Sequence, residues 1–461
     1  MSSRQKGVVA RGIGWGRIAS AVGLLLLAGT AAAEDPSLIG ELIDSLCESG
    51  DLTPDRCREL RARAAAEAEA GAEPSAEDPT GWRTTWRNNF RVERNDGLHQ
   101  LRFGGRIQLD WAALALSPSL EDTIGGDGYG IEFRRARMFT DGLLYRRLFF
   151  KFQFGFEDAE LSFQDVYMGL LFPSIRTSVL VGHAYEPFSL EQLESSKYTT
   201  FMERALPTIL APSRNTGIRI RHFPANERTT FDAGFYLNTD NSGEFLSDGS
   251  RDSENFDLTA RVTGLPLYGP AGRRIVHVGL AYAHQFRNPR SPVRYAQRPE
   301  SHLAPQLVDT LLLPADNVDL LGVEFAWVHE SFLLQSEAMA SWVDRVDAPR
   351  TAFWGATAEI SYFLTGEHRI YDREFAVFDR VSPTHDFNPG AGGWGAWQVA
   401  ARYSYLDLSD RDVRGGRLHD MTLGINWYLY ANARIVTNYV YAKRKPSGHA
   451  NLFQMRFEIN F

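Results

Sequence analysis

The chain has 461 residues and a net charge of −8, a balance that gives no support for a nucleic-acid partner. After the first 35 residues no apolar run reaches the roughly 20 residues of a membrane-spanning helix, so the sequence argues against a helical membrane protein. A closed β-barrel is then the one way in which this chain can cross a membrane, and its 12% aromatic content suits such a barrel.

Residues 1–33 have the pattern of a secretory signal. A basic start is followed by the apolar stretch 18–28 and by the small residues 31–33, which are typical of a cleavage site. The alternative is a membrane anchor, but the apolar stretch is short for one. We therefore predict export.

Residues 34–70 predict a short helical hairpin, since apolar residues recur at helical spacing on both sides of Gly50. Cys47 and Cys57 are the two cysteines of the chain. In an oxidising compartment they can form a disulfide, and a pair of reduced thiols is the alternative. No histidine lies near them, so a metal site is not expected. The hairpin could serve as a spacer, as a trimer contact or as a cell-wall tether, and the sequence does not distinguish these roles. Residues 71–98 are predicted to form a linker.

From residue 99 onward, apolar and polar residues alternate in segments separated by turns. In the segment 150–157, four phenylalanines share one face and Lys151, Gln153 and Glu157 lie on the other. The final segment alternates in the same way and ends on Phe461, which resembles the assembly signal of bacterial outer-membrane barrels. Lipid is the natural partner of faces this apolar.

Sixteen strands are predicted, and an even number leaves both ends of a barrel in the periplasm. A wall of this size also encloses an aqueous lumen. The segments are 99–113, 129–145, 147–158, 161–172, 175–186, 214–224, 228–239, 253–265, 273–286, 316–330, 331–346, 350–365, 393–409, 417–431, 433–444 and 450–461.

Parity of the strands assigns each connection to one side of the membrane. Short turns fall in the periplasm, and the longer connections 114–128, 187–213, 240–252 and 287–315 fall outside. The connection 366–392 is long, yet parity places it in the periplasm. Either this turn is elaborate or a strand nearby has been miscounted.

The same alternation directs charged side chains into the lumen. An arginine turned toward lipid at mid-membrane costs about 2–4 kcal/mol, so the polar face must point inward. Of the 49 basic residues only five are lysines, which makes the predicted lumen rich in arginine. The residues predicted to face inward on this ground include Arg102, Arg106, Gln108, Asp110, Arg219, Arg221, Asp257, Arg261, Gln398 and Arg402.

Several segments of residues 99–461 resemble the phosphate-selective porin O/P family. They are Gly104–Asp110 (GGRIQLD), Ile131–Arg137 (IEFRRAR), Gln164–Gly169 (QDVYMG), Val181–His183 (VGH) leading into Pro187–Glu191 (PFSLE), Phe201–Pro207 (FMERALP), Asn215–Ile218 (NTGI), Tyr362–Glu367 (YFLTGE) and Ala400–Ser404 (AARYS).

The resemblance implies a trimeric, sixteen-stranded channel of the bacterial outer membrane, with its third extracellular loop, here 187–213, folded into the pore. It implies pore roles for Arg134, Arg135 and Arg204, and weaker ones for Lys197 and Arg214. Arg134 and Arg135 are adjacent, so both can serve the pore only through a β-bulge or if one sits at the rim. With the inward arginines above, the predicted anion-binding set is Arg106, Arg134, Arg135, Lys197, Arg204, Arg219 and Arg221.

The predicted function is passive or facilitated diffusion of small solutes, with a preference for anions such as phosphate. Guanidinium groups bind the oxygens of such anions in pairs. Two alternatives remain: the arginines pair with lumen carboxylates and select nothing, or a plugged barrel anchors a tethering protein. No catalytic motif occurs and no cofactor is expected; lipid, small anionic solutes and two further copies of the chain are the expected partners.

Overall fold

The structure is a computed structural model that describes Cys57 and residues 78–461, except 87, 125, 158–160, 240–242, 244–254 and 289–290. Two compact units are distinguished, residues 1–78 and 79–461. The predicted signal peptide, almost all of the helical hairpin and Cys47 lie outside the described residues. The disulfide between Cys47 and Cys57 therefore stays a prediction. No helix in the described part is long and apolar enough to cross a membrane.

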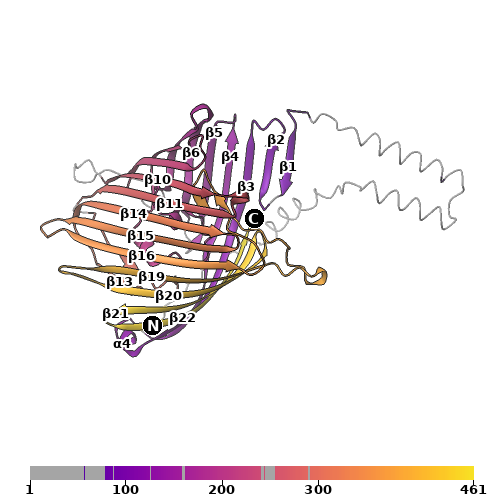
Figure 1. The fold of residues 1–461 in the computed structure, drawn as a ribbon. Helices are drawn as coiled ribbons and strands as arrows, with labels where there is room; N and C mark the ends of the chain where they lie inside the picture. Colours follow the sequence, from indigo (N-terminus) through magenta and orange to yellow (C-terminus); the bar gives the residue numbers. More distant parts are fainter. Residues whose placement is uncertain are drawn as a thin grey trace, which may run out of the picture. The chain divides into compact units, whose positions relative to one another are not determined.

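Sixteen antiparallel strands form a closed barrel (Figure 1). Closure comes from β22, which pairs with β3 from Ala450 opposite Leu116 to Asn460 opposite Arg106. Every predicted segment corresponds to one strand, so the sixteen-stranded fold is confirmed. The strands are β3 (Gln100–Leu116), β4 (Gly128–Leu144), β5 (Leu148–Gly155), β6 (Ser162–Phe172), β7 (Thr177–Tyr185), β8 (Arg214–His222), β9 (Thr229–Leu237), β10 (Phe256–Tyr268), β11 (Arg274–Phe286), β14 (Ala315–His329), β15 (Phe332–Arg345), β16 (Thr351–Phe363), β19 (Ala396–Asp410), β20 (Val413–Tyr430), β21 (Ala433–Lys445) and β22 (Gly448–Asn460).

The alternation along β3 shows why these residues form a wall. Ile107 and Trp111 are 41% and 37% exposed on the outer face, whereas Arg106 and Gln108 on the inner face are 5% and 0% exposed. Apolar side chains thus point outward and polar ones inward, as the period of two requires.

The predicted linker 71–98 contains a β-hairpin, which corrects the sequence-based assignment. Strands β1 (Trp82–Trp86) and β2 (Phe90–Arg94) pair with each other, and β2 continues onto β3, where Phe90 lies opposite Phe103. β2 pairs with residues 100–103 of β3, on the same edge of β3 where the pairing with β22 ends at Arg106. The hairpin was missed because each strand has only five residues.

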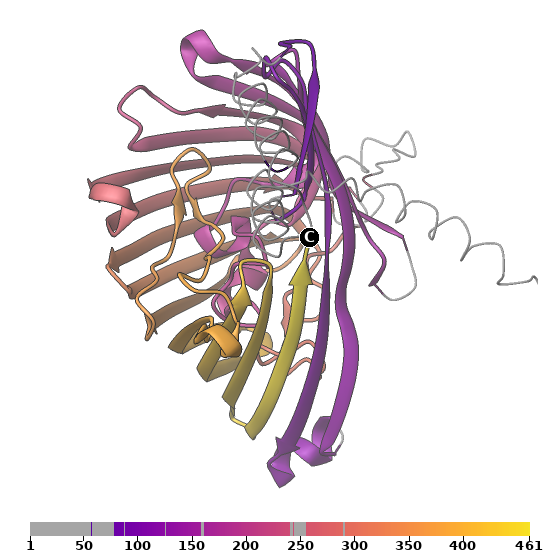
Figure 2. The same ribbon diagram turned by 90° about the vertical axis from the view of Figure 1, so that its right-hand side faces the viewer.

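The long connection between β16 and β19 is a folded segment, and no strand was miscounted. It contains β17 (Tyr371–Asp372), β18 (Val377–Phe378) and the turn η6 (Pro389–Ala391). It is called the periplasmic segment here, residues 364–395. Figure 2 shows it in orange, in front of the barrel opening.

Part of the inner wall is apolar, which the simple inward–outward rule does not predict. One hydrophobic cluster joins the loop 287–314, which carries β12 (Ala296–Gln297) and β13 (Val308–Asp309), to the inner faces of β14–β16 and β19–β22. Another joins the periplasmic segment to β10, β11, β14 and β15. The inner wall is apolar where a connection folds back into the barrel and buries it.

Candidate solute pathway

The predicted pore loop 187–213 corresponds to residues 186–213, called the infolded loop here, between β7 and β8. It contains the short helix α5 (Leu190–Leu193) and the 3-10 helix η3 (Leu206–Leu210). The Ser189 side chain caps α5 by accepting a hydrogen bond from the Gln192 N–H at 3.1 Å. Most of the loop is buried, which is possible only because it lies inside the barrel.

Inward-facing side chains from four strands hold the infolded loop. Glu337 of β15 accepts the N–H groups of Leu190 and Glu191, at 3.0 and 2.7 Å. Further round the wall, Asn438 of β21 accepts the Met202 N–H at 3.0 Å. Arg402 of β19 and Arg456 of β22 donate to the carbonyls of Glu203 and Met202, at 2.9 and 2.5 Å. The loop is therefore fixed across the lumen.

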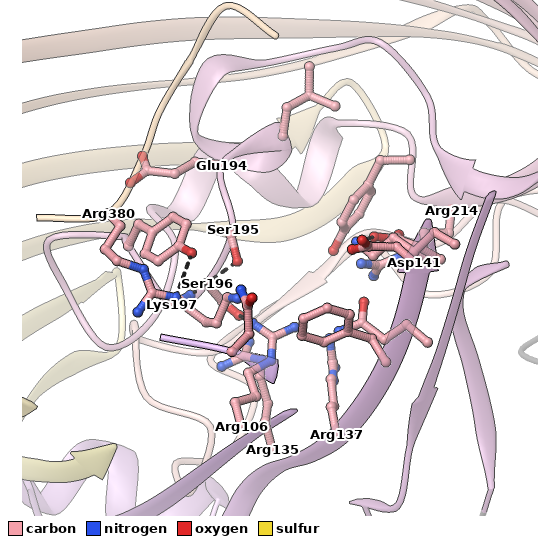
Figure 3. Close-up of a pocket in the computed structure, with 18 of the residues that line it drawn as sticks. Arg106, Arg135, Arg137, Asp141, Glu194, Ser195, Ser196, Lys197, Arg214 and Arg380 are labelled. Atoms are coloured by element: carbon pink, nitrogen blue, oxygen red, sulfur yellow. Dashed lines mark hydrogen bonds and ion pairs between the residues drawn. The ribbon is translucent and has the colours of Figure 1, made fainter. Parts of the chain in front are cut away.

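A cavity of about 300 Å³ lies between the infolded loop and the strands β3–β8, and we call it the inner cavity. Figure 3 shows Arg106, Arg135 and Arg137 extending from the wall toward Ser196 and Lys197 of the loop. Its basic lining residues are Arg102, Arg106, Arg135, Arg137, Lys151, Lys197, Arg204, Arg214 and Arg380, and its acidic ones are Asp141, Asp165 and Glu194.

Several of these cations have a carboxylate partner. Lys151 and Arg214 share Asp165, at 2.6 and 2.8 Å. Arg102 pairs with Asp141 at 2.6 Å, and Arg137 pairs with Glu157 at 2.6 Å. Such pairs stiffen the wall, and most of their positive charge is balanced locally.

Four other cations have only neutral partners within the described residues. Arg106 donates to the Ser196 hydroxyl at 2.7 Å, and its Nε is buried without a partner. The Lys197 ammonium lies 5.5 Å from the Phe139 ring. The two others donate to backbone carbonyls: Arg204 to those of residues 191, 192 and 194, and Arg380 to that of residue 431. The inner cavity thus has an excess of positive charge.

Two more cavities adjoin the inner cavity toward the extracellular side. The outer cavity, of about 270 Å³, shares Arg204 with it and is also lined by Arg134 and Glu203. The side cavity, of about 400 Å³, shares Arg214 with it. The outer and side cavities thus each share one lining residue with the inner cavity.

A β-bulge directs both arginines of the adjacent pair inward. Gln108 of β3 lies opposite Arg135 and the next residue, Leu109, lies opposite Phe133, so Arg134 is the extra residue. Arg134 then binds Glu203 through two hydrogen bonds of 2.9 and 3.0 Å. Arg135 approaches the same carboxylate to 3.8 Å and lines the inner cavity.

The predicted set is divided by the structure. Arg106, Arg135, Lys197 and Arg204 line the inner cavity, and Arg134 lines the outer one. Arg219 and Arg221 line none of these cavities; both bind Asp232, at 2.8 and 3.0 Å, in a buried ion-pair network between β8 and β9.

The predicted set omits several cations, among them Arg456 and Arg380. Arg456 is fully buried and binds both Asp110 and Glu203, at 2.7 and 2.8 Å. Its position in the alternation of the last strand indicated an inward direction. Arg380 lies on the periplasmic segment, and the unusual length of that connection was the only signal for it.

Residues 101–461 match the family described as phosphate-selective porin O and P. The chain belongs to this family.

Two relatives illustrate the membership. An uncharacterized protein of Caulobacter vibrioides is 30% identical over 345 residues, covering 73% of this chain and 67% of the relative. Porin O of Pseudomonas aeruginosa is 26% identical over 388 residues, covering 76% of this chain and 85% of that protein.

Solved structures share the fold at low sequence identity. The anion-selective porin from Comamonas acidovorans has a TM-score of 0.52 at 12% identity, covering 79% of this chain and all of that porin. OmpT of Vibrio cholerae has a TM-score of 0.51 at 12% identity, covering 79% of this chain and 98% of OmpT. The protein is therefore a porin of the bacterial outer membrane. Within the described residues no group of three or more potential metal ligands occurs.

Proposed function

We propose that this porin conducts small anions in preference to cations, through the outer and inner cavities. The observation that carries the proposal is a group of four cations around one cavity, Arg106, Lys197, Arg204 and Arg380, which have no carboxylate partner among the described residues. A cavity with this charge excess attracts anions and repels cations, although the whole chain carries −8.

Conduction needs several moderate sites rather than one deep site, because the solute must also leave. The lining meets this requirement. An anion that enters the outer cavity meets Arg134, whose charge Glu203 largely balances, and then Arg204, which lines both cavities. Arg106, Lys197 and Arg380 follow in the inner cavity. Guanidinium groups bind phosphate or carboxylate oxygens in pairs at every working pH.

The description of the family and that of one structural neighbour agree with this preference. The family is described as phosphate-selective, and one structural neighbour is described as an anion-selective porin. We accordingly propose phosphate and other small oxyanions as the favoured solutes.

The alternative, a plugged barrel that serves as a tether, has less support. The infolded loop, the loop 287–314 and the periplasmic segment do fill much of the lumen. They nevertheless leave cavities of about 270, 300 and 400 Å³, and the first and the third each share a lining residue with the second. A purely anchoring barrel has no need for adjoining cavities lined with cations.

Planar-bilayer recordings of the purified protein test the proposal. In asymmetric potassium chloride, we expect the zero-current potential to have the same sign as the equilibrium potential of chloride. Phosphate added to one side should reduce the chloride current, because it occupies the same cations. A zero-current potential of the sign that potassium sets would refute the anion preference, and channels that never open would favour the tether.

We also propose a homotrimer. Strands β5–β9 have 8 to 11 residues, whereas the other strands of the barrel have 13 to 18. A tilted strand needs about 9–11 residues to cross the membrane, so these five strands just span it while the rest of the wall extends beyond it, and we infer that this low part of the wall contacts neighbouring copies. Chemical cross-linking in mild detergent should give a trimer band, and a monomer band alone would contradict the proposal.

A further inference from the structure

A group of basic side chains lies on the outer face of the barrel, near the extracellular ends of the neighbouring strands β20, β21 and β22 (Figure 1). Lys443 and Lys445 of β21 are exposed there, and they are two of the five lysines of the chain. Arg417 and His419 of β20 and His449 of β22 lie beside them. Alternate residues of a strand point to one face, so all five side chains share the outer face. We call these five residues the basic rim patch.

Tyrosines place the basic rim patch at the level of the lipid headgroups. Tyr403 of β19 and Tyr441 of β21 are exposed on the same outer face, one step closer to the periplasm. The Tyr403 hydroxyl lies 2.8 Å from His419 Nδ1. Beyond the tyrosines the outer face of β20 is apolar and exposed, at Met421, Leu423 and Ile425. Exposed aromatic residues flank the apolar band of a membrane barrel, so the patch begins where the lipid tails end.

The strand register brings the members of the patch close together. Arg417 lies directly opposite Lys445, and His419 lies directly opposite Lys443. On its other side, Lys443 lies opposite His449. Like charges in directly opposite positions destabilise a pair of strands, so the contact of Arg417 with Lys445 is unfavourable unless an anion lies nearby.

Little of this positive charge is balanced by the protein itself. Asp407 of β19 binds Arg417 at 2.8 Å and also accepts a hydrogen bond from the Tyr405 hydroxyl at 3.0 Å. Neither Lys443 nor Lys445 forms an ion pair with any of the described residues. The patch therefore presents an excess of positive charge to the surface of the membrane.

Another part of the extracellular rim is balanced. Arg350, in the turn between β15 and β16, pairs with Asp319 and also with Asp344, the latter at 3.1 Å. His284 of β11 lies 2.8 Å from the same Asp319. Each of these basic side chains thus has a carboxylate within ion-pair distance, and the charge excess of the basic rim patch is not a general feature of the rim.

We propose that the basic rim patch binds the phosphate groups of the glycolipid in the outer leaflet of the outer membrane, whose headgroup is a phosphorylated disaccharide. Basic residues beside a membrane attract anionic headgroups, and ammonium and guanidinium groups bind phosphate oxygens by charge-assisted hydrogen bonds. Residues on one face of a strand are about 7 Å apart and opposite residues about 5 Å apart, so one phosphate group can contact two or three of these side chains. The acyl chains of the same lipid would lie along the apolar face below the tyrosines.

This proposal does not rest on the anion preference of the pore, because the barrel wall separates the patch from the lumen. Lipid binding by the full-length protein in mild detergent tests it. The probe is lipid A with both phosphate groups, and the matched probe is the same lipid after removal of the phosphates. Titrations followed by native mass spectrometry give the Kd for each, with EDTA present so that divalent cations do not bridge phosphate to carboxylates. We expect the wild type to bind the phosphorylated lipid at least about tenfold more tightly.

Substitution of the two lysines locates the site. Lys443→Gln with Lys445→Gln should weaken binding of the phosphorylated lipid about 30-fold, since each basic residue beside an anionic lipid contributes about fivefold. Lys443→Arg with Lys445→Arg should retain the wild-type Kd. Arg350→Gln is the matched control, because it removes a cation of the same rim that already has carboxylate partners, and it should also bind as the wild type does. None of these variants should change the zero-current potential.

Migration in detergent gels before and after boiling shows whether each variant has folded. If the double glutamine variant does not fold, the single variant Lys445→Gln replaces it, with an expected loss of about fivefold. Equal affinity of the wild type for the two lipids would overturn the proposal. So would an unchanged Kd in the folded glutamine variant, or an equal loss of binding in Arg350→Gln.

Discussion

Removal of the unpaired cations is the sharpest perturbation that the structure suggests. In the variant Arg106→Gln with Lys197→Gln, at a pH at least one unit below the Lys197 pKa of about 7, two positive charges leave the inner cavity while the ion pairs of the wall remain. Arg106 loses one hydrogen bond, to Ser196, and the fold should be retained.

The size of the effect follows from Coulomb's law. A monovalent anion about 4 Å from a cation gains about 1 kcal/mol even at the dielectric constant of water. Two cations then contribute about 2 kcal/mol, which corresponds to about 30-fold in anion occupancy of the cavity. A less polarisable cavity strengthens this attraction and also raises the cost of desolvating the anion, so about 30-fold is the expected order of magnitude.

The zero-current potential in asymmetric potassium chloride measures this change. The zero-current potential of the double variant should shift strongly toward the equilibrium potential of potassium. Arg219→Gln is the matched control, since Arg219 also faces inward but binds Asp232 and lines none of the three cavities. An unchanged double variant, or an equal shift in the control, would refute the reasoning.

Three further outcomes are expected. Burial and the neighbouring Arg106 lower the pKa of Lys197 to about 7, so raising the pH from one unit below this value to one unit above should reduce the anion preference. Lys197→Arg should abolish this pH dependence, and a wild-type anion preference that does not change with pH would contradict the prediction. Glu203→Gln should increase the anion preference by about 1 kcal/mol or more, because Arg134 and Arg456 lose a partner at 2.9 and 2.8 Å. A lower ratio of anion to cation permeability, measured from the zero-current potential, would contradict this. Tyr295→Ala should cost about 3–5 kcal/mol in thermal unfolding, because Tyr295 is buried between the loop 287–314 and the wall; Tyr129→Ala, which removes a side chain that is 86% exposed, is the control.

The barrel could be predicted because lipid and water impose a simple rule on alternate residues. The rule is local, and it assigned Ile107 outward and Arg106 inward without any knowledge of neighbouring strands. It failed where connections fold back inside. The run Tyr439–Ala442 is apolar at every position: Tyr439 and Tyr441 are exposed on the outer face, whereas Val440 and Ala442 are buried by a connection inside the barrel.

The division of the arginines into paired and unpaired ones depends on contacts between strands, so alternation alone could not supply it. Arg221 lies directly opposite Asp232 in the register of β8 and β9. Pairing these two strands across their short turn would have identified that ion pair from the sequence. Nothing comparable was available for Arg369 and Glu194, which are 175 residues apart and meet only through two connections that enter the barrel from opposite ends.

The occupancy of the inner cavity by ions tests the central claim most directly. Crystals soaked in rubidium bromide allow the two ions to be located separately by anomalous scattering. We predict bromide beside Arg106, Lys197 and Arg380, and no rubidium in the same cavity. Rubidium at that place, or bromide found only outside the barrel, would contradict the account.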